Sequence, residues 1–355
     1  MKGLLLAGGH GTRLRPLTYT GNKHMLPIAN KPMLLYGLEH LRNAGIKDIG
    51  VVLGPIRESV VETLGDGSKF GVKLTYINQP EPLGLAHAVK ISEKFMARDS
   101  FVMYLGDNLL KQGVAGFVDT FKRKELDCLV GVYPVKEPSR FGIAEMKGHK
   151  LVRLVEKPKK PKSNLALIGV YVFGPSIFSA VKKIKPSWRN ELEITDAIQH
   201  LLSAGKKVEA EKVEGWWKDT GRPEDLLEAN QLVLADIRSS AGDLLPLGVK
   251  VSGHVSLGKE TKFSGQASLL GPIIIGENCR IGPDVRLGPY TSIQDGCQLR
   301  DVEIENSIIM KDSTIEGAQR IVDSLVGSNS TILGGNRSLH RGYKFVLGER
   351  SFVQV

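Results

Sequence analysis

Residues 3–18 read GLLLAGGHGTRLRPLT, and this stretch decides how the N-terminal part of the chain folds. The apolar run from Leu4 to Ala7 predicts a buried strand. Gly8, Gly9 and Gly11 follow at once, and glycine lets a backbone approach a ligand closely or turn with positive φ. Backbone N–H groups in such a loop can surround phosphate oxygens. The stretch therefore predicts a strand that ends in an anion-binding loop.

Two basic residues stand just beyond the glycines. Arg13 comes two residues after Gly11, and Lys23 opens the run KHMLP, which leads to Lys31–Pro32. An arginine can bind two phosphate oxygens at once through its planar guanidinium group. The glycine loop and these charges together indicate a nucleoside triphosphate as ligand.

Two common glycine loops do not fit this stretch. A dinucleotide-binding loop follows G-x-G-x-x-G, and counted from Gly9 the last position is Leu14. A P-loop follows G-x-x-x-x-G-K-[ST], but Gly11 is followed by Thr12 and Arg13. An ordinary glycine turn without a ligand would leave the charges at Arg13 and Lys23 unexplained.

Length and composition place the chain among globular proteins. With 355 residues it is long for one domain, and two domains are the better expectation. It has 41% hydrophobic residues and no apolar run near the ~20 residues that span a bilayer, so no membrane partner is expected. Three cysteines, at 128, 279 and 297, form neither a C-x-x-C motif nor a disulfide framework, which indicates a cytoplasmic protein.

The net charge of +10 admits a nucleic-acid partner but does not favour one. No block of Lys and Arg is interleaved with aromatic residues, and aromatics make up only 6% of the chain. The densest basic run, KPKKPK at residues 157–162, is interrupted by proline and reads as a solvated loop. We therefore expect small anionic substrates and no nucleic acid.

Residues 1–240 alternate short apolar runs with helical patterns. This alternation predicts a Rossmann-like α/β domain with a mixed sheet covered by helices on both faces. The predicted strands, after the first, are residues 49–53, 73–77, 101–105, 128–132, 142–146, 151–156 and 167–173. Three helices are predicted: one begins at Pro32 and ends at Gly45, the second covers residues 194–202, and the third runs from residue 223 to about 237.

Residues 241–355 follow a different sequence pattern, in which aliphatic residues recur every six positions. The repeat runs through Val251, Leu257, Phe263, Leu269, Ile275, Ile281, Leu287, Ile293 and Leu299. Such a period is typical of a parallel β-helix in which three hexapeptides make one coil, and it resembles the left-handed hexapeptide-repeat helices. The phase slips after Leu299 and resumes through Ile309, Ile315 and Ile321.

Two aspartates follow apolar strands next to a glycine: Asp107 in the run GDN and Asp219 in the run WKDTG. Ligands bind at the carboxyl ends of strands in open α/β sheets. Two converging carboxylates suit Mg²⁺, which takes one or two carboxylates together with phosphate oxygens. An aspartate after a strand more often caps a turn, so the pairing is the hypothesis to test.

Amide and carboxylate side chains at other strand ends could hold a base and a sugar. Gln79 and the backbone at Gly84 could read a pyrimidine edge, because an amide both donates and accepts. Glu156 could accept hydrogen bonds from sugar hydroxyls, and Lys157 could bind a sugar phosphate. A surface glutamine and a solvated ion pair are the plainer alternatives.

The motifs together resemble the signature of the sugar-1-phosphate nucleotidylyltransferases: G-G-x-G-T-R-L-x-P-L-T, then P-K-x-L-x-P, then K-P-M. Phrases at 84–88, 186–196 and 215–221 extend the resemblance over the chain and are similar to the long form of the thymidylyltransferases that act on glucose 1-phosphate. Asn22, His24 and Asn190 depart from the pattern, where Pro, Gln and Gly are usual.

The resemblance implies a Mg²⁺-dependent transfer of a nucleotidyl group from dTTP, or UTP, to a sugar 1-phosphate. It implies that Arg13 holds the leaving pyrophosphate and Lys23 the α-phosphate, with Lys157 on the incoming phosphate and Asp107 and Asp219 on the metal. The implied nucleotide-binding residues are Gly8, Gly9, Gly11, Thr12, Gln79, Gly84 and Asp107. The implied sugar-phosphate-binding residues are Gly142, Glu156, Lys157 and Leu167.

Two alternatives remain open at the sequence level. One is uridylyl transfer to glucose 1-phosphate or N-acetylglucosamine 1-phosphate, with acetyl transfer on the β-helix. The other is a sugar-nucleotide-binding subunit without turnover, against which the intact Arg13, Lys23, Asp107, Lys157 and Asp219 speak. Of the two histidines in the β-helix domain, His254 has no neighbouring Asn or Asp to orient it, and His340 follows the regular repeats. We therefore expect this domain to form contacts in a homo-oligomer.

Overall fold

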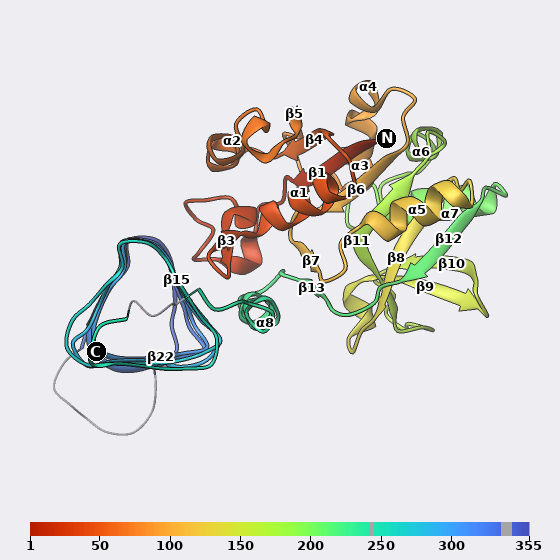
Figure 1. Cartoon of the computed structure of the whole chain (residues 1–355). Helices are drawn as coiled ribbons and strands as arrows, with labels where there is room; N and C mark the ends of the chain where they lie inside the picture. The colour runs from red at the N-terminus through yellow and green to blue at the C-terminus, as the bar shows by residue number, and fades with distance from the viewer. Residues whose placement is uncertain (241–244, 335–342, 355) are drawn as a thin grey trace. The chain divides into compact units, whose positions relative to one another are not determined.

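The computed structural model describes residues 1–240, 245–334 and 343–354, and the chain forms two compact units (Figure 1). The sheet unit consists of Met1–His10 and Met33–Asp219. The coil unit consists of Gly11–Pro32 and Thr220–Val355. The domain boundary predicted between residues 240 and 241 borders on 241–244, which lie outside the described residues, and it stays a prediction.

The sheet unit alternates strands and helices along the chain. Its strands are β1 (Lys2–Ala7), β4 (Asp48–Leu53), β5 (Lys73–Asn78), β6 (Phe101–Leu105), β7 (Asn108–Leu110), β8 (Cys128–Pro134), β9 (Gly142–Lys147), β10 (Lys150–Glu156), β11 (Leu165–Phe173), β12 (Val208–Lys212) and β13 (Trp217–Asp219). Its helices are α1 (Met33–Asn43), α2 (Glu58–Leu64), α3 (Leu85–Ile91), α4 (Glu93–Met96), α5 (Ala115–Arg123), α6 (Ile177–Val181) and α7 (Ile194–Ser203). The predicted strands are all present within a residue or two at each end.

One mixed sheet organises this unit, in the order β10-β9-β11-β6-β1-β4-β5; β8 also pairs with β11, and β12 pairs with β8. Strands β6, β1, β4 and β5 are parallel, so their carboxyl ends meet at one edge. Strand β11 runs antiparallel to β6 and joins the parallel part to the β9–β10 hairpin. The predicted mixed α/β sheet is therefore confirmed.

Helices cover both faces of the sheet, and β1 shows why its whole run is apolar. Leu4 and Leu6 belong to a buried cluster that also contains residues of α3, α6 and α7. Leu5 packs on the other face, where a Cβ at Gly37 of α1 would lie 3.1 Å from its Cδ1. A strand buried on both faces has no polar alternation, which is the pattern from which it was predicted.

In the coil unit, the segment Gly11–Pro32 packs with α8 (Pro223–Leu234). The segment contains a short hairpin of β2 (Pro27–Ile28) and β3 (Lys31–Pro32). The Ala29 N–H in the hairpin turn donates to Asn230 Oδ1 at 2.8 Å, and Asn30 Nδ2 donates to the carbonyl of Ile293 at 2.6 Å. The α8 helix is shorter than the predicted 223–237, because the last turn is irregular.

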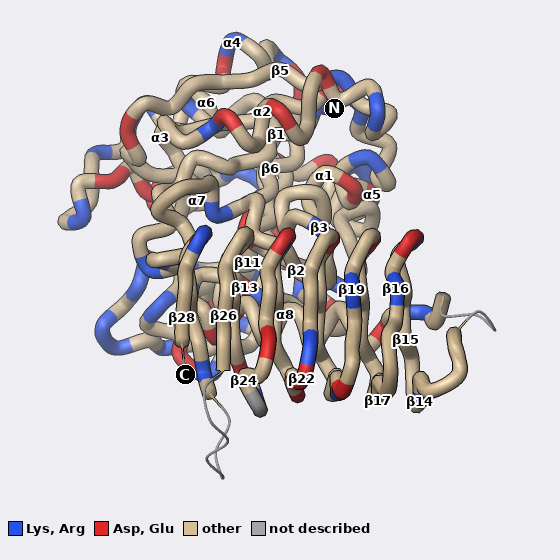
Figure 2. The backbone as a smooth tube through the Cα atoms, turned by 90° about the vertical axis from the view of Figure 1, so that its left-hand side faces the viewer, with Lys and Arg blue, Asp and Glu red and all other residues tan. Residues whose placement is uncertain are grey.

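The rest of the coil unit is a parallel β-helix whose coils stack side by side in Figure 2. Its strands are β14 (Val249–Ser252), β15 (Val255–Leu257), β16 (Lys262–Phe263), β17 (Ala267–Leu270), β18 (Ile273–Ile275), β19 (Arg280–Ile281), β20 (Val285–Leu287), β21 (Thr291–Ile293), β22 (Gln298–Glu305), β23 (Ile308–Ile309), β24 (Thr314–Val322), β25 (Leu325–Val326), β26 (Thr331–Leu333), β27 (Val346–Leu347) and β28 (Phe352–Gln354). Every strand pairing within it is parallel, which confirms the predicted architecture.

The register explains both the repeat and its slip. Val249 pairs with Ala267, and Ala267 with Val285, so each early coil advances by 18 residues, or three hexapeptides. Leu299 then pairs with Ile315, an advance of 16 residues. The coil shortens there, and this shortening shifts the phase of the aliphatic repeat.

The first coil departs from the predicted interior stack. Val251, predicted to face inward with the later repeat residues, is 41% exposed. It lies on β14, which ends its sheet and pairs only with β17, so no preceding coil covers it. From Leu269 onward the repeat residues are buried as predicted.

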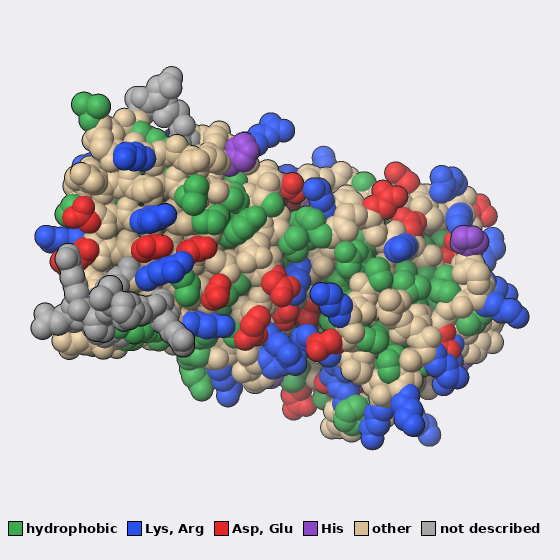
Figure 3. Space-filling model, turned by 90° about the horizontal axis from the view of Figure 1, so that it is seen from below, with side chains coloured by type: hydrophobic (Ala, Val, Ile, Leu, Met, Phe, Trp, Pro, Cys, Tyr) green, Lys and Arg blue, Asp and Glu red, His purple; other side chains and the backbone are tan. Residues whose placement is uncertain are grey.

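The described helices are all too short or too polar to cross a bilayer. On the face drawn in Figure 3, Lys and Arg side chains are scattered among Asp and Glu side chains. The excess positive charge is therefore not gathered into one field on that face.

Candidate active site

The loop after β1 approaches the end of β5 closely. A Cβ at Gly8 would lie 3.1 Å from Gln79 Oε1 and 3.4 Å from the Gly54 backbone nitrogen. A Cβ at Gly54 would lie only 2.6 Å from the Gly8 carbonyl oxygen. Glycine is therefore needed for these two loops to meet, and their meeting places Gln79 beside the predicted phosphate-binding loop.

The Gln79 side chain is buried and held at its amide nitrogen. Nε2 donates to the Gly84 carbonyl at 3.3 Å and lies 3.0 Å from His87 Nδ1. Within the described residues, no hydrogen bond to Gln79 Oε1 is found, and this oxygen faces Gly8. An amide fixed in this way offers an acceptor to a ligand.

Gly84 has a structural role as well as the predicted binding role. Its φ of 100° lies in the left-handed region, and a Cβ there would collide with the Leu192 carbonyl oxygen. The Leu192 N–H donates to Leu83 at 2.8 Å, and its carbonyl accepts from Ala86 at 3.0 Å. Gly84 thus lets the loop before α3 contact the loop before α7.

The two predicted metal-binding aspartates are close along the backbone. Strand β13 pairs antiparallel with β7, and Asp219 stands opposite Asn108, the neighbour of Asp107. Asn108 Nδ2 donates to Asp107 Oδ1 at 2.9 Å, and Asn108 Oδ1 accepts from Trp217 Nε1 at 2.7 Å. The buried Asn108 side chain therefore ties Asp107 to the strand that carries Asp219.

This donor set suits Mg²⁺, a hard cation that prefers oxygen ligands and retains water. Among the described residues, no group of three or more His, Cys, Asp or Glu side chains could form an all-protein metal site. A site formed by two carboxylates would leave the remaining coordination positions to water and phosphate oxygens.

The predicted sugar-binding residues form a second cluster. Gly142 opens β9 opposite Glu156, which ends β10. A Cβ at Gly142 would lie 2.7 Å from Thr195 Cγ2, 3.0 Å from Glu156 Oε2 and 3.9 Å from Leu167 Cδ1. The Thr195 hydroxyl donates to Glu156 Oε2 at 3.2 Å. The structure thus brings Gly142, Glu156 and Leu167 together.

Several charges surround the Glu156 carboxylate. Arg189 Nη1 lies 3.4 Å from one Glu156 oxygen and 3.4 Å from a Glu193 oxygen, and Lys157 Nζ lies 3.8 Å from Glu156. Burial raises the pKa of Glu156, and the charge of Glu193 adds to the rise, while Lys157, Thr195 and Arg189 oppose it. Lys157 has a φ of 40°, a strained backbone conformation that often marks functional sites.

Strand β11 connects the two clusters. A Cβ at Gly169 would lie 2.8 Å from both Leu105 Cγ and Asn108 Cγ, so β11 passes directly beside the Asp107 cluster. Leu167, two residues earlier on the same strand, lies beside Gly142 in the second cluster. A nucleotide phosphate near Asp107 and a sugar near Glu156 would therefore be neighbours.

Gly9 lies in the loop after β1, in the sheet unit, and the remaining predicted residues lie in the coil unit. Gly11 has a φ of 64°, and a Cβ there would lie 2.9 Å from Lys23 Cβ, so the two residues touch. Thr12 and Arg13 lie in a 3-10 turn, Thr12–Leu14, and both are exposed. Lys23 opens a second such turn, Lys23–Met25, and is half-buried.

Two residues that depart from the family pattern contact each other. Asn22 Oδ1 accepts from the His24 backbone N–H at 2.9 Å and lies 2.6 Å from His24 Nδ1. Asn22 thereby caps the turn that begins with Lys23. The pair keeps Lys23 in a defined turn without the usual proline.

With this geometry in place, comparison with known proteins identifies the family. The profile described as "Nucleotidyl transferase" matches residues 2–236, and a "GMPPB C-terminal domain" profile matches residues 269–354. The chain belongs to the nucleotidyl transferase family. It is therefore an enzyme of nucleotidyl transfer.

Relatives of this nucleotidyltransferase match it over its full length. It is 46% identical to the low-salt glycan biosynthesis nucleotidyltransferase Agl11 of Haloferax volcanii, with 100% of both chains covered. It is 44% identical to glucose-1-phosphate thymidylyltransferase of Streptomyces antibioticus, covering 100% of this chain and 99% of that one. A crystal structure of a candidate thymidylyltransferase from Bacillus anthracis, bound to sucrose, matches 67% of this chain and 96% of that one at 38% identity and a TM-score of 0.63.

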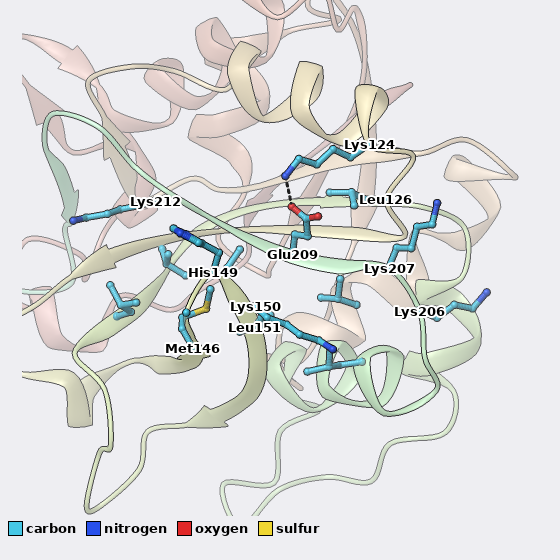
Figure 4. A pocket seen from close by; sticks show the side chains of 16 residues that line it. Lys124, Leu126, Met146, His149, Lys150, Leu151, Lys206, Lys207, Glu209 and Lys212 are labelled. Carbon is cyan, nitrogen blue, oxygen red and sulfur yellow. Dashed lines mark hydrogen bonds and ion pairs between the residues drawn. The ribbon is translucent and has the colours of Figure 1, made fainter.

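The nucleotidyltransferase also has a hollow of about 1130 Å³ away from these clusters (Figure 4). Its walls come from the β9–β10 hairpin, β8, β12 and the ends of α5 and α7, with lysine side chains around apolar ones. None of the predicted site residues lines it. The site described above is therefore not this hollow.

Four residues of the site were missed by sequence reasoning: His87, Asn108, Arg189 and Thr195. Each acts on a predicted residue through its side chain, so its role depends on a contact that the sequence does not display. Arg189 and Thr195 do fall within the stretch 186–196 that carries the family resemblance, and Asn108 follows Asp107 directly.

Proposed function

We propose that this nucleotidyltransferase transfers a thymidylyl group from dTTP to α-D-glucose 1-phosphate, giving dTDP-glucose and pyrophosphate. The full-length similarity to a thymidylyltransferase supports this assignment. The observation that carries it is the orientation of Gln79, whose amide nitrogen is held by Gly84 and His87. The oxygen that remains is an acceptor for the N3–H of thymine.

The sugar 1-phosphate binds at the Gly142 cluster. Glu156 accepts hydrogen bonds from sugar hydroxyls, and the absent side chain at Gly142 leaves space beside its carboxylate. Lys157, which follows Glu156 directly, neutralises the sugar phosphate. Its ammonium group lies 3.8 Å from Glu156, and its backbone φ of 40° is strained.

The reaction is an in-line attack of a sugar phosphate oxygen on the α-phosphorus of dTTP. One P–O bond forms at the α-phosphorus, the bond to the β-phosphate oxygen breaks, and pyrophosphate leaves with the electron pair. The attacking oxygen is already charged, so no general base is needed. Catalysis then rests on positioning the two substrates and neutralising their charge.

Mg²⁺ would be held by Asp107 and Asp219, and it would supply neutralising charge to the phosphate oxygens. Arg13 and Lys23 are proposed for the pyrophosphate and the α-phosphate on the strength of the motif that carries them. Gly8, Gly9, Gly11 and Thr12 provide the backbone of the phosphate loop.

Uridylyl transfer is a second candidate because uracil presents the same edge to Gln79 as thymine. Acetyl transfer on the β-helix has less support. His254 is exposed, and its Nδ1 lies 3.5 Å from Ser239 Oγ, a contact that does not orient a catalytic base. His340 lies outside the described residues.

Product analysis tests the proposal. The enzyme is incubated with Mg²⁺ and dTTP or UTP, together with glucose 1-phosphate or N-acetylglucosamine 1-phosphate, and the sugar nucleotide is identified by mass spectrometry. We expect the rate of dTDP-glucose formation to be the highest of the four, or to lie within tenfold of the rate of UDP-glucose formation. Preferential formation of an N-acetylglucosamine product, or no product in any mixture, would contradict the proposal.

A further inference from the structure

We infer that His87 is a positioning residue for base selection: its ring fixes the Gln79 amide so that the oxygen, and not the nitrogen, faces the base. This inference rests on the proposed function, because it assigns to Gln79 the reading of an imide edge. His87 itself contacts Gln79 and is not assigned to substrate.

The contacts of the Gln79 amide leave one arrangement of donors and acceptors. The amide nitrogen has two hydrogens, and its two partners are the Gly84 carbonyl at 3.3 Å and His87 Nδ1 at 3.0 Å. The carbonyl can only accept, so the amide nitrogen faces that side. His87 provides the shorter of the two contacts, and it must accept through Nδ1.

Nδ1 accepts only when the imidazole is neutral with its proton on Nε2. Burial lowers the pKa of His87, and the charge of Lys90 lowers it further, while Glu81 acts in the opposite direction. The ring is thus kept neutral near pH 7, where it can hold the amide in the described orientation.

The orientation matters because pyrimidines differ at the atom that would face Gln79. Thymine and uracil carry N3–H, a donor, which pairs with the amide oxygen. Cytosine carries an unprotonated N3, an acceptor, which would meet the same oxygen without a hydrogen between them. Leaving a buried polar group unpaired costs roughly 1–3 kcal/mol. Rotation of the amide by 180° would reverse this preference.

His87 substitutions test the inference through the ratio of kcat/KM for dTTP to that for dCTP. His87→Leu removes the acceptor at similar size, whereas His87→Gln restores one through its side-chain oxygen. We expect the ratio to fall at least tenfold in His87→Leu, about 1.4 kcal/mol, and to return to within about threefold of wild type in His87→Gln. His87→Ala repeats the test if leucine destabilises α3.

The outcomes separate the inference from the proposed function. If wild type prefers dTTP over dCTP and both His87→Leu and His87→Ala keep that preference, the inference is wrong and the proposed function stands. Equal loss of the ratio in His87→Gln would also overturn it, because the lost element would then not be the acceptor. A wild-type enzyme with no preference for dTTP over dCTP would overturn both.

Discussion

Asp107 and Asp219 allow the smallest change that tests the chemistry, the replacement of one oxygen by an amide nitrogen. Asp219 stands opposite Asn108 in the β7–β13 pair, and Asp107 directly precedes Asn108 in the chain. Asp107→Asn and Asp219→Asn should each lower kcat by at least about 100-fold, or about 2.7 kcal/mol, because each removes half of the carboxylate charge proposed for Mg²⁺. Steady-state rates of pyrophosphate release measure the effect.

Asp119→Asn is the matched control. Asp119 is exposed on α5, so its substitution should leave kcat and thermal stability unchanged. Near-normal activity of either Asp107→Asn or Asp219→Asn in Mg²⁺ would show that the two carboxylates do not form the proposed site.

Glu156 gives the sugar site a distinct pH dependence. Its raised pKa means that the carboxylate takes up a proton above the ordinary glutamate value of about 4.3. The protonated group has lost acceptor capacity for sugar hydroxyls. We therefore expect KM for glucose 1-phosphate to rise as the pH falls from about 8 towards 5.

Glu156→Gln separates this effect from titration of the sugar phosphate itself, which both enzymes share. Its KM should be higher than that of wild type at pH 8 and should lack the additional rise on acidification. The free energy of unfolding should also depend on Glu156. Because its pKa is raised in the folded state, its stabilising contribution is largest below the pKa of the unfolded state and is lost as the pH rises through the pKa of the folded state. If KM for glucose 1-phosphate depended on pH identically in the two enzymes, Glu156 would not be part of the sugar site.

At this scale, residues within a recognisable motif could be proposed from the sequence, whereas residues whose place depends on a contact in the folded chain could not. Gly142, Glu156 and Leu167 were predicted and lie together. Arg189 was not, because nothing in a sequence shows that its guanidinium group joins Glu156 to Glu193. Such pairings arise from folding two distant segments against each other.

At the scale of elements, the interior of the β-helix should protect its thiols. Burial raises the pKa of Cys297 to about 12 and also raises the pKa of Cys279. The third cysteine, Cys128 on β8 of the sheet unit, is buried as well, and its pKa is also raised. A thiol reacts with disulfide reagents as the thiolate. We expect no reaction of native enzyme with Ellman's reagent at about pH 8, and reaction of three thiols after denaturation.

Lys262→Cys supplies a positive control, because Lys262 is exposed on the β-helix and its replacement should add one fast-reacting thiol. Rapid modification of Cys279 or Cys297 in the native enzyme would mean that the coils are less closely packed than described.

Elements were the most predictable level. Strands buried on both faces and the hexapeptide repeat leave periodic signals, and both were found where predicted. The shortened coils after Leu299 were not predictable in detail, because the advance from Leu299 to Ile315 depends on how each corner turns. The exposed Val251 follows from its place in the first coil, and sequence periodicity does not mark an end.

At the scale of the whole molecule, the segment Gly11–Pro32 groups with residues 220–355 rather than with its sequence neighbours. The contact from Asn30 to Ile293 spans 263 residues and leaves no periodic trace in the sequence. The sequence therefore gives no sign that this segment groups with the C-terminal part of the chain.

Asn230 of α8 is the residue that joins the parts of the coil unit. Its side chain is fully buried; Oδ1 accepts from Ala29 at 2.8 Å and from Ser292 at 2.7 Å, and Nδ2 donates to Tyr290 at 2.9 Å. Asn230→Leu leaves those three groups unpaired, so we expect a loss of at least about 2 kcal/mol in the free energy of unfolding.

Chemical denaturation measures this loss, with Gln231→Ala on the same helix as control. The Gln231 side chain donates to Asn306 at 2.8 Å in a half-buried position, and its removal should cost less than about 1 kcal/mol. An unchanged unfolding midpoint in Asn230→Leu would refute the joining role. The homo-oligomer expected from the sequence stays a prediction, and light scattering would test it by measuring the molar mass in solution.

The proposed function depends most on the recognition of a pyrimidine imide edge, and nucleotide specificity tests this recognition most directly. Initial rates of pyrophosphate release are measured with glucose 1-phosphate, Mg²⁺ and dTTP, UTP, ATP or GTP. Thymine and uracil differ by one methyl group, worth only ~0.8 kcal/mol on burial, so we expect kcat/KM for dTTP and UTP within roughly tenfold of each other. The purine triphosphates should react far more slowly, because a second ring needs space and different edge groups. Rates with ATP or GTP equal to the rate with dTTP would contradict the account.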